Sequence, residues 1–229
     1  MSDRKFDIGL LVLGYCRADL FERAARSLEH LGLGESTPRY GVIDGARTLS
    51  GPLFDDCLAV QQRAKKLLDE GVLTSLTIRN CNLGTMNNVY TSVSEILSLH
   101  EFVFVLEDDL EILQIADCAV ELLLPYLNER VSAFGIYCNK SFSDSLFFSQ
   151  RFSSQAWGTS REAWAGFNPV HIMSLELSEA QRIELRKNVG GDFISSFRAF
   201  QSGDLDSWAI PWNIYNFLQN RVMLYTPNS

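Results

Sequence analysis

Short apolar runs alternate, along the first half of the chain, with segments in which apolar residues recur every three or four positions. The runs predict strands over residues 6–13, 39–43, 73–78 and 102–106. The periodic segments predict one helix that ends near Gly32, a second over about 55–70 and a third that carries Val89 and Val93 on one face. This order predicts an α/β fold, with a doubly wound, mostly parallel sheet flanked by helices.

The strand over 102–106 runs directly into three adjacent acids, Glu107, Asp108 and Asp109. Its five consecutive apolar residues are typical of a strand buried on both faces of a parallel sheet. Like charges repel, so either a cation or a fully solvated turn must compensate them there. Mg²⁺ and Mn²⁺ prefer such oxygen ligands. The alternative is that Asp108 and Asp109 only cap the next helix.

Polar residues also follow the other predicted strands, at Cys16-Arg17, at Asp44 and over 80–84. Crossovers between parallel strands are short and right-handed, so the carboxyl ends of these strands should share one sheet edge. Ligands of open α/β sheets bind at that edge. We therefore expect these residues and the three acids to converge on one site.

The second half of the chain is less regular, with a strand-like segment at 133–138, a polar stretch at 139–145 and an aromatic-rich segment at 147–164. It contains no linker, repeat or low-complexity tract, so we expect one domain over 1–229. All four tryptophans lie in this half. They could form a platform for a sugar ring or fill a core, and core is the favoured interpretation.

Composition narrows the class of protein. The net charge of −8 and the lack of a long basic run argue against a nucleic-acid partner. No apolar stretch is long enough to span a bilayer or resembles a secretory signal. We expect a cytoplasmic protein, either free or attached peripherally at the inner face of the membrane.

The five cysteines and three histidines show no spacing typical of a zinc site, a disulfide framework or a hydrolase triad. Cys16, beside Arg17, could be an activated nucleophile, but a structural thiol is the favoured interpretation.

Six blocks in order now resemble a GT-A-fold glycosyltransferase: LVLGYCR at 11–17, YGVIDG at 40–45, NLG at 82–84, VFVLEDD at 103–109, QAWGT at 155–159 and DLDSW at 204–208. More narrowly, the chain resembles bacterial family 2-type sugar transferases and their distant relative, the N-acetylglucosaminyltransferase I family. The resemblance implies an inverting, metal-dependent hexosyl- or N-acetylhexosaminyl-transferase. Its substrates would be a nucleotide-sugar donor, expected to be a UDP-sugar, and a glycan or lipid-linked acceptor. It also implies a nucleotide-sugar half over about 1–110 and an acceptor half over about 111–229.

The resemblance further implies residue roles. Asp109 would bind a Mn²⁺ or Mg²⁺ ion that bridges the donor diphosphate, and Asp44 would accept a hydrogen bond from the nucleotide base. The remaining donor-binding residues would be Arg17, Asn82, Gly84, Glu107, Asp108, Trp157 and Gly158. For Asp44 the alternative is an ordinary Asp-Gly turn.

An inverting transferase needs a carboxylate to take the proton of the acceptor hydroxyl. Asp206 matches the N-acetylglucosaminyltransferase I family and Asp204 the family 2 pattern, and we favour Asp206. Asp192, after Gly190-Gly191, is a weaker third candidate. The alternative is that Asp204 and Asp206 cap the helix that follows them.

The chain departs from the family pattern at Ser160 and Pro211, and it ends at Ser229, before the late histidine that relatives carry. We expect that water and phosphate oxygens complete the metal coordination, or that the polypeptide is a fragment or an inactive relative. A non-catalytic nucleotide- or partner-binding module is therefore an alternative function. A sugar nucleotidyltransferase is less favoured, because Gly14 is the single glycine of the 14–18 loop.

Overall fold

The structure, a computed structural model, describes residues 6–113, 119–136 and 145–226. Its strands are β1 Ile8–Gly14, β2 Arg39–Ile43, β3 Ser75–Ile78, β4 Phe102–Glu107, β5 Val131–Gly135, β6 Phe147–Ser149, β7 Trp157–Ser160 and β8 Val222–Tyr225. Its α-helices are α1 Ala18–Ser27, α2 Pro52–Asp69, α3 Gly84–Leu99, α4 Ala119–Leu123, α5 Arg161–Trp164, α6 Pro169–Met173, α7 Glu179–Asn188, α8 Asp192–Ser202 and α9 Ala209–Leu218. Short 3₁₀ helices cover Leu28–Leu31 and Leu124–Tyr126.

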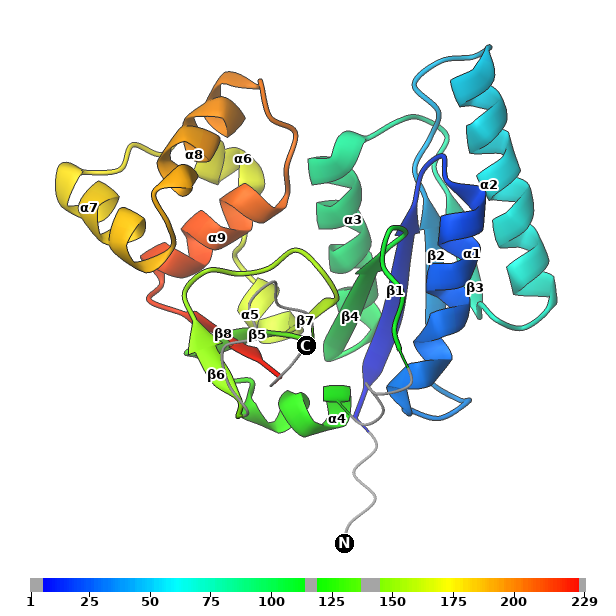
Figure 1. The fold of residues 1–229 in the computed structure, drawn as a ribbon, viewed down its shortest axis with the longest axis horizontal. Coiled ribbons are helices and arrows are strands. Elements are labelled where there is room, and N and C mark those ends of the chain that lie inside the picture. The colour runs from blue at the N-terminus through cyan, green and yellow to red at the C-terminus, as the bar shows by residue number, and fades with distance from the viewer. Residues whose placement is uncertain (1–5, 114–118, 137–144, 227–229) are drawn as a thin grey trace, which may run out of the picture.

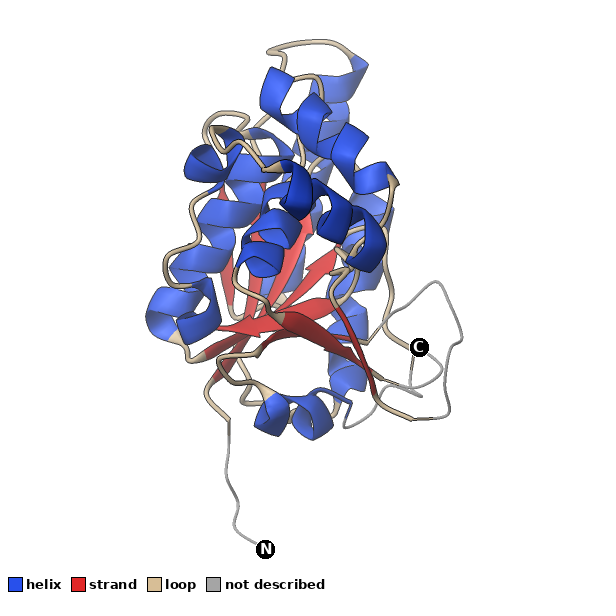
Figure 2. Cartoon of the chain, turned by 90° about the vertical axis from the view of Figure 1, so that its left-hand side faces the viewer, coloured by secondary structure: helices blue, strands red, loops and turns tan. Residues whose placement is uncertain are grey.

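The strands form one sheet in the order β3-β2-β1-β4-β7-β5-β8-β6. β1 pairs in parallel with β2 and β4, and β2 pairs in parallel with β3. The sheet is twisted, with helices on both of its sides (Figures 1 and 2). The predicted single-domain α/β fold with a mostly parallel sheet is therefore confirmed, and the carboxyl ends of β1, β2 and β4 lie at one edge.

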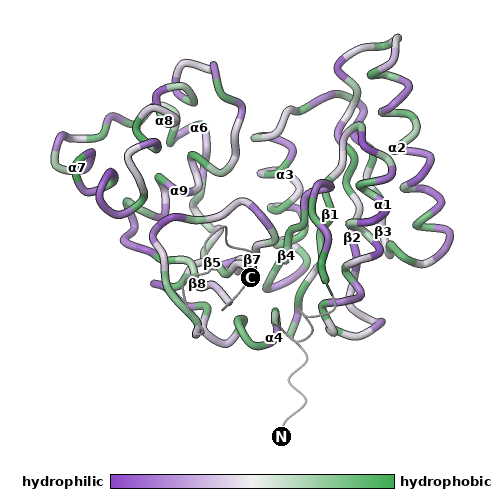
Figure 3. The backbone as a smooth tube through the Cα atoms, in the orientation of Figure 1, coloured by the Kyte–Doolittle hydropathy of each residue, from purple (hydrophilic) through white to green (hydrophobic). Residues whose placement is uncertain are grey.

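Side-chain alternation along the central strands divides the apolar residues between two cores. Leu10 and Val12 of β1 join the cluster under α1 and α2, whereas Leu11 and Leu13 join the cluster under α3, α8 and α9. Phe104 of β4 belongs to the first cluster. Hydrophobic residues dominate β1 and β4 in Figure 3. Both faces of these strands are thus covered, which explains their continuous apolar runs.

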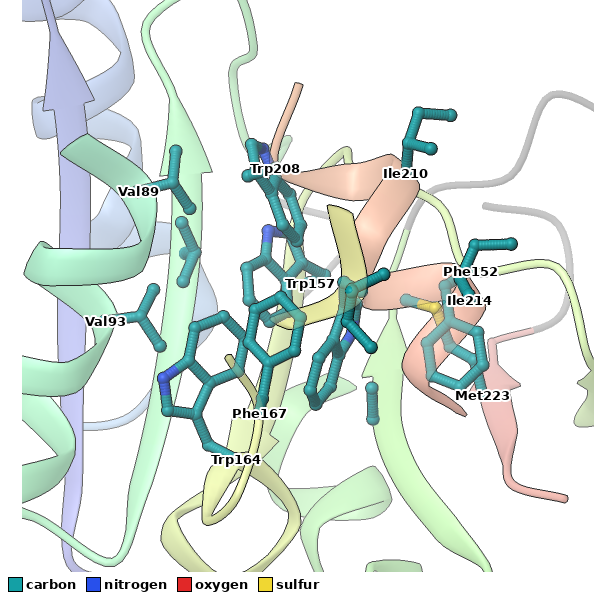
Figure 4. Close-up of a cluster of buried hydrophobic side chains, with 14 of the residues drawn as sticks. Val89, Val93, Phe152, Trp157, Trp164, Phe167, Trp208, Ile210, Ile214 and Met223 are labelled. Carbon is teal, nitrogen blue, oxygen red and sulfur yellow. The ribbon is translucent and has the colours of Figure 1, made fainter. Parts of the chain in front are cut away.

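The tryptophans belong to the second core. Their exposed fractions are 1% for Trp157, 6% for Trp164, 3% for Trp208 and 1% for Trp212. The rings of Trp157 and Trp208 stack with centroids 4.4 Å apart, and Trp164 lies beside them (Figure 4). The core interpretation is confirmed, and the sugar platform is not formed by these rings.

The structure differs from the predictions mainly outside the first four strands. The predicted first helix ends at Ser27 and continues as a 3₁₀ turn over Leu28–Leu31, after which Gly32 adopts a φ of 65°. The sequence pattern did not predict that β7 would run antiparallel between β4 and β5. The strand-like segment at 133–138 begins earlier, at Val131 in β5, and its last two residues lie outside the described residues, as does most of the polar stretch at 139–145.

Among the described residues, no helix has both the length and the apolar character that crossing a membrane requires.

Truncating a core aromatic should test the packing across the sheet. Phe104 has no exposed surface and stacks on Phe134, so Phe104→Ala should lower the free energy of unfolding by about 3–5 kcal/mol. Urea unfolding followed by circular dichroism measures this change. Phe148→Ala is the control, because that side chain is 58% exposed and should change stability by less than about 0.5 kcal/mol. Equal losses in the two variants would contradict the assignment of the core.

Candidate functional site

A pocket lies at the carboxyl edge of β1, β2 and β4, where the start of α3 forms its wall. Six predicted site residues line it: Arg17, Asp44, Asn82, Gly84, Glu107 and Asp108. The sequence reasoning missed Tyr15, Arg47, Thr85 and Asn88, which also line the pocket. Tyr15 and Arg47 lie in loops, which carry no periodic pattern, whereas Thr85 and Asn88 lie in the first turns of α3. Their positions within or near the quoted blocks were the only signal.

The three acids at the end of β4 occupy different environments. Asp108 is 5% exposed, whereas the Asp109 side chain is 49% exposed. Arg17 forms an ion pair with Asp108, and its Nη1 lies 3.7 Å from Asp109 Oδ2. Burial raises the pKa of Asp108, and the bond from Arg17 partly offsets this shift. Arg17 therefore supplies positive charge to the cluster.

Residues 108–113 contain no helix, so the interpretation of Asp108 and Asp109 as helix caps is wrong. They sit instead in the turn that leaves the sheet edge.

The carboxyl of Glu107 has a strongly raised pKa. Burial raises the pKa of its carboxyl to about 7, and the charges of Asp109 and Asp108 contribute in the same direction. The indole Nε1 of Trp208 donates a 3.2 Å hydrogen bond to Glu107 Oε1, which favours the ionised form. The loop before α9 thus contacts the acidic end of β4.

Asp44 is 5% exposed and holds the turn before α3. Its Oδ1 accepts 2.9 Å bonds from the backbone N–H groups of Gly45 and Leu83. Its Oδ2 accepts bonds from Asn82 Nδ2 at 2.9 Å and from the N–H of Gly84 at 3.1 Å. A carboxylate offers about four lone-pair sites. The predicted hydrogen bond from a nucleotide base to Asp44 would therefore require one of these bonds to break.

Asp206 does not line the pocket itself but contacts the start of α3, where Gly84 and Thr85 do. Its Oδ2 accepts a 2.7 Å bond from the N–H of Thr85, and its Oδ1 accepts a 2.9 Å bond from the N–H of Met86. Gly84 has a φ of 76°, and a Cβ there would lie 2.6 Å from Asp206 Oδ2. Gly84 is thus required both by its backbone conformation and by the close approach of Asp206.

The other candidate bases lie apart from this contact. Asp204 is exposed, and its Oδ2 accepts a 2.6 Å bond from the hydroxyl of Ser202. Asp192 pairs with Arg151 at 2.9 Å, which lowers the pKa of Asp192. The cap of α9 is Trp208, and no side-chain bond caps this helix. The interpretation of Asp204 and Asp206 as caps of the helix that follows them, α9, is therefore wrong.

Two predicted donor-binding residues do not line the pocket. Trp157 is buried against Trp208, and a Cβ at Gly158 would lie 2.3 Å from the ring of Phe134. Trp157 and Gly158 therefore pack in the core beside the site. Burial and the charge of Asp108 raise the pKa of the Cys16 thiol, which agrees with a structural thiol rather than a nucleophile.

The carboxylates after β4 fit a divalent cation that would also be held by the phosphates of a bound substrate. No group of three His, Cys, Asp or Glu side chains that could hold a metal occurs in the part of the chain that the structure describes. Mg²⁺ and similar ions, however, often rely on one or two carboxylates plus substrate phosphates and water. Asp109 is accessible for this role, and Asp108 Oδ2 is buried without a hydrogen-bond partner among the described residues.

Comparison with solved structures shows the fold. A mannosyltransferase from Pyrobaculum calidifontis in complex with GDP-Man and Mn²⁺ matches with a TM-score of 0.50 and 14% identity, over 92% of this chain and 73% of its own. S. aureus TarS 1–349 in complex with UDP matches with a TM-score of 0.52 and 11% identity, over 98% and 59%. GalNAc-T7 with UDP, GalNAc and Mn²⁺ matches with a TM-score of 0.50 and 10% identity, over 99% and 43%. A scan against protein-family models and a search of curated proteins gave no match.

The chain therefore has the GT-A fold. It spans less than two thirds of TarS 1–349 and of GalNAc-T7. The closer relation to the N-acetylglucosaminyltransferase I family stays a prediction.

The raised pKa of Glu107 should make stability depend on pH. Glu107 ionises near its ordinary 4.5 in the unfolded chain and at about 7 in the folded protein. The contribution of protonated Glu107 to the free energy of unfolding is therefore fully present below pH 4.5. It is lost as pH rises through 7, by up to about 3 kcal/mol. Glu107→Gln cannot ionise, so its stability relative to the wild type should increase between pH 5 and 8.

Urea unfolding with EDTA at several pH values measures this difference. Glu95→Gln is the control, because it removes the charge of a half-exposed carboxylate outside the pocket. Parallel stability profiles for the wild type and Glu107→Gln would show that Glu107 keeps an ordinary pKa.

Proposed function

We propose that this protein is an inverting, metal-dependent glycosyltransferase that moves a sugar from a nucleotide-sugar donor, a UDP-sugar in the first instance, to a glycan or lipid-linked acceptor. The observation that carries this proposal is the pocket at the carboxyl edge of the sheet, in which Arg17 pairs with Asp108, the residue directly after β4. The transferred group would be a hexosyl or N-acetylhexosaminyl unit. We also propose a role in polysaccharide biosynthesis, in the cytoplasm or at the inner face of the membrane.

Donor binding is assigned to residues of the first half of the chain. Arg17 is 47% exposed in its side chain and can meet a phosphate or a base edge while it stays close to Asp108. Asn82 and Gly84 form the turn beside the donor, where the lack of a Cβ at Gly84 allows close approach. Glu107 and Asp108 present carboxylates to the hydroxyl groups of the nucleoside.

Asp109 is assigned as the protein ligand of Mn²⁺ or Mg²⁺. A bound cation stabilises the negative charge that develops on the leaving diphosphate. The solved structures of the Pyrobaculum calidifontis mannosyltransferase and of GalNAc-T7 contain Mn²⁺. The exposure of Asp109 and its distance of 3.7 Å from Arg17 support this assignment, since a cation bound by Asp109 and the guanidinium of Arg17 could contact the same diphosphate.

The general base is assigned to Asp206. Its carboxylate would take the proton of the acceptor hydroxyl as the hydroxyl oxygen attacks the anomeric carbon and the bond to the diphosphate breaks. The contacts of Asp206 with Thr85 and Met86 support this choice, because they hold the carboxylate beside the pocket. Asp204 is the alternative base, and the acceptor would bind the half over about 111–229.

A non-catalytic, nucleotide-binding module is the second candidate function. The observation that favours it is that the pocket is lined by assigned nucleotide-binding residues but not by Asp109, Asp204 or Asp206. Such a module would bind a nucleoside diphosphate but would transfer no sugar.

Removing the carboxylate of Asp109 should abolish metal-dependent donor binding. Calorimetric titration of the wild type with UDP should show binding that requires Mn²⁺. In Asp109→Asn the affinity should fall by about tenfold or more, because the ion loses the one protein carboxylate assigned to it. GDP serves as the comparison nucleotide, and Glu95→Gln as the charge control. Equal UDP affinity with Mn²⁺ and with EDTA in the wild type would refute this metal site.

Replacing the base should separate binding from transfer. Asp206→Asn should keep UDP affinity and lower the rate of transfer by about 10²–10⁴-fold. The measurement is release of UDP and formation of product with a panel of nucleotide sugars and acceptors. Asp204→Asn tests the competing assignment, and a large loss there with retained transfer in Asp206→Asn would move the base to Asp204.

A further inference from the structure

The start of α3 is held by two acids that come from distant parts of the chain. A helix begins with N–H groups that have no partner within the helix. Here the N–H groups of Leu83 and Gly84 donate to Asp44, and those of Thr85 and Met86 donate to Asp206. The local cap residue, Leu83, supplies no side-chain bond. Four consecutive N–H groups are thus shared between the end of β2 and the loop before α9.

The two acids differ in how firmly they are held. Asp44 is buried, accepts four bonds, and its own N–H donates to Gly14 O at 2.9 Å. Asp44 therefore fixes the turn before α3 to the centre of the sheet. Asp206 is exposed and comes from the connection between α8 and α9, which runs beside the upper end of α3 in Figure 1. Its two bonds to Thr85 and Met86 are the contacts that orient its carboxylate.

The space beside Gly84 permits this orientation. A Cβ at that position would lie 2.6 Å from Asp206 Oδ2, so any side chain would push the carboxylate away. The N–H of Gly84 is also one of the donors to Asp44. The same residue is therefore fixed on one side by Asp44 and makes room for Asp206 on the other.

We propose that Asp44 is a positioning residue for the general base: it fixes the turn at 82–84, and this turn presents the N–H groups of Thr85 and Met86 to Asp206. The inference rests on the proposed function, because it takes Asp206 as the base. Two N–H bonds set the direction of the carboxylate and leave its other lone pairs for the proton of the acceptor. Small misplacements of a reacting group can cost about 10²-fold in rate. Asp44 then acts on transfer rather than on the nucleotide base.

The decisive variant is Asp44→Asn. The amide nitrogen cannot accept a hydrogen bond, so the turn loses at least one of its bonds while the volume of the side chain is kept. We expect kcat for transfer to fall by about 10–100-fold. The affinity for UDP and Mn²⁺ should fall by a smaller factor, because Asn82 and Gly84 belong to the loosened turn but Arg17 and Asp109 keep their places. Glu95→Gln is the matched control on the same helix, and it should change neither quantity. If Asp44 contacted the nucleotide base, the affinity for UDP would fall and kcat at saturating donor would stay, which would overturn the proposal.

A second measurement does not depend on activity. Amide hydrogen exchange of Thr85 and Met86, followed by NMR, should be slow in the wild type because both N–H groups are bonded. Asp206→Ala and Asp44→Asn should both speed this exchange, and Glu95→Gln should leave it unchanged. Unprotected amides in the wild type, or slow exchange in Asp44→Asn, would contradict the positioning role. A wild type that shows this protection but transfers no sugar would refute the proposed function alone.

Gly84→Ala tests the other premise of the proposal, that the contact with α3 orients Asp206. The methyl group would meet Asp206 Oδ2 while Asp44 stays intact. We expect faster exchange at Thr85 and Met86 and a loss of kcat. Unchanged exchange and unchanged kcat in this variant would show that the contact with Asp206 does not orient the base.

Discussion

The repulsion among three carboxylates at the end of β4 is the constraint on which the rest of the site depends. The strand brings them to the edge of a core, where Glu107 and Asp108 lose much of their water. Separate partners compensate them: Arg17 reaches Asp108 from the segment after β1, and Trp208 reaches Glu107 from the loop before α9. Asp109 keeps its exposure. The arrangement holds two acids in place and leaves the third exposed to solvent.

The same principle of long-range compensation applies to the start of α3. Its N–H groups carry partial positive charge, and acids at this end of a helix are favourable. Asp44 and Asp206 provide them from positions that lie 39 to 121 residues away. The helix therefore joins the end of β2 to the loop before α9. Segments from both halves of the chain meet at one helix terminus, so the geometry of one depends on the other.

Local pattern was sufficient to predict the strands β1 to β4 and the position of the acids, because apolar periodicity and strand burial act over a few residues. It could not reveal that Asp206 would contact Thr85, since nothing in the residues near either one encodes a contact at that separation. The antiparallel β7 was missed for a related reason: Trp157–Ser160 is short, and its polarity resembles that of a loop. The role of Asp44 likewise depends on donors from 82–84, which only the folded chain brings together.

The position of β7 also bears on how the chain can be made. Until residues 157–160 leave the ribosome, β4 has no neighbour on one side, although its apolar residues and unpaired backbone groups are ready to pair with another strand. About fifty residues of synthesis separate the two strands, an interval in which a nascent chain is prone to association with other chains. The proposed donor and acceptor halves, divided at residue 110, would therefore differ in function but could not be produced as two separate proteins. The first piece would end in an open sheet edge.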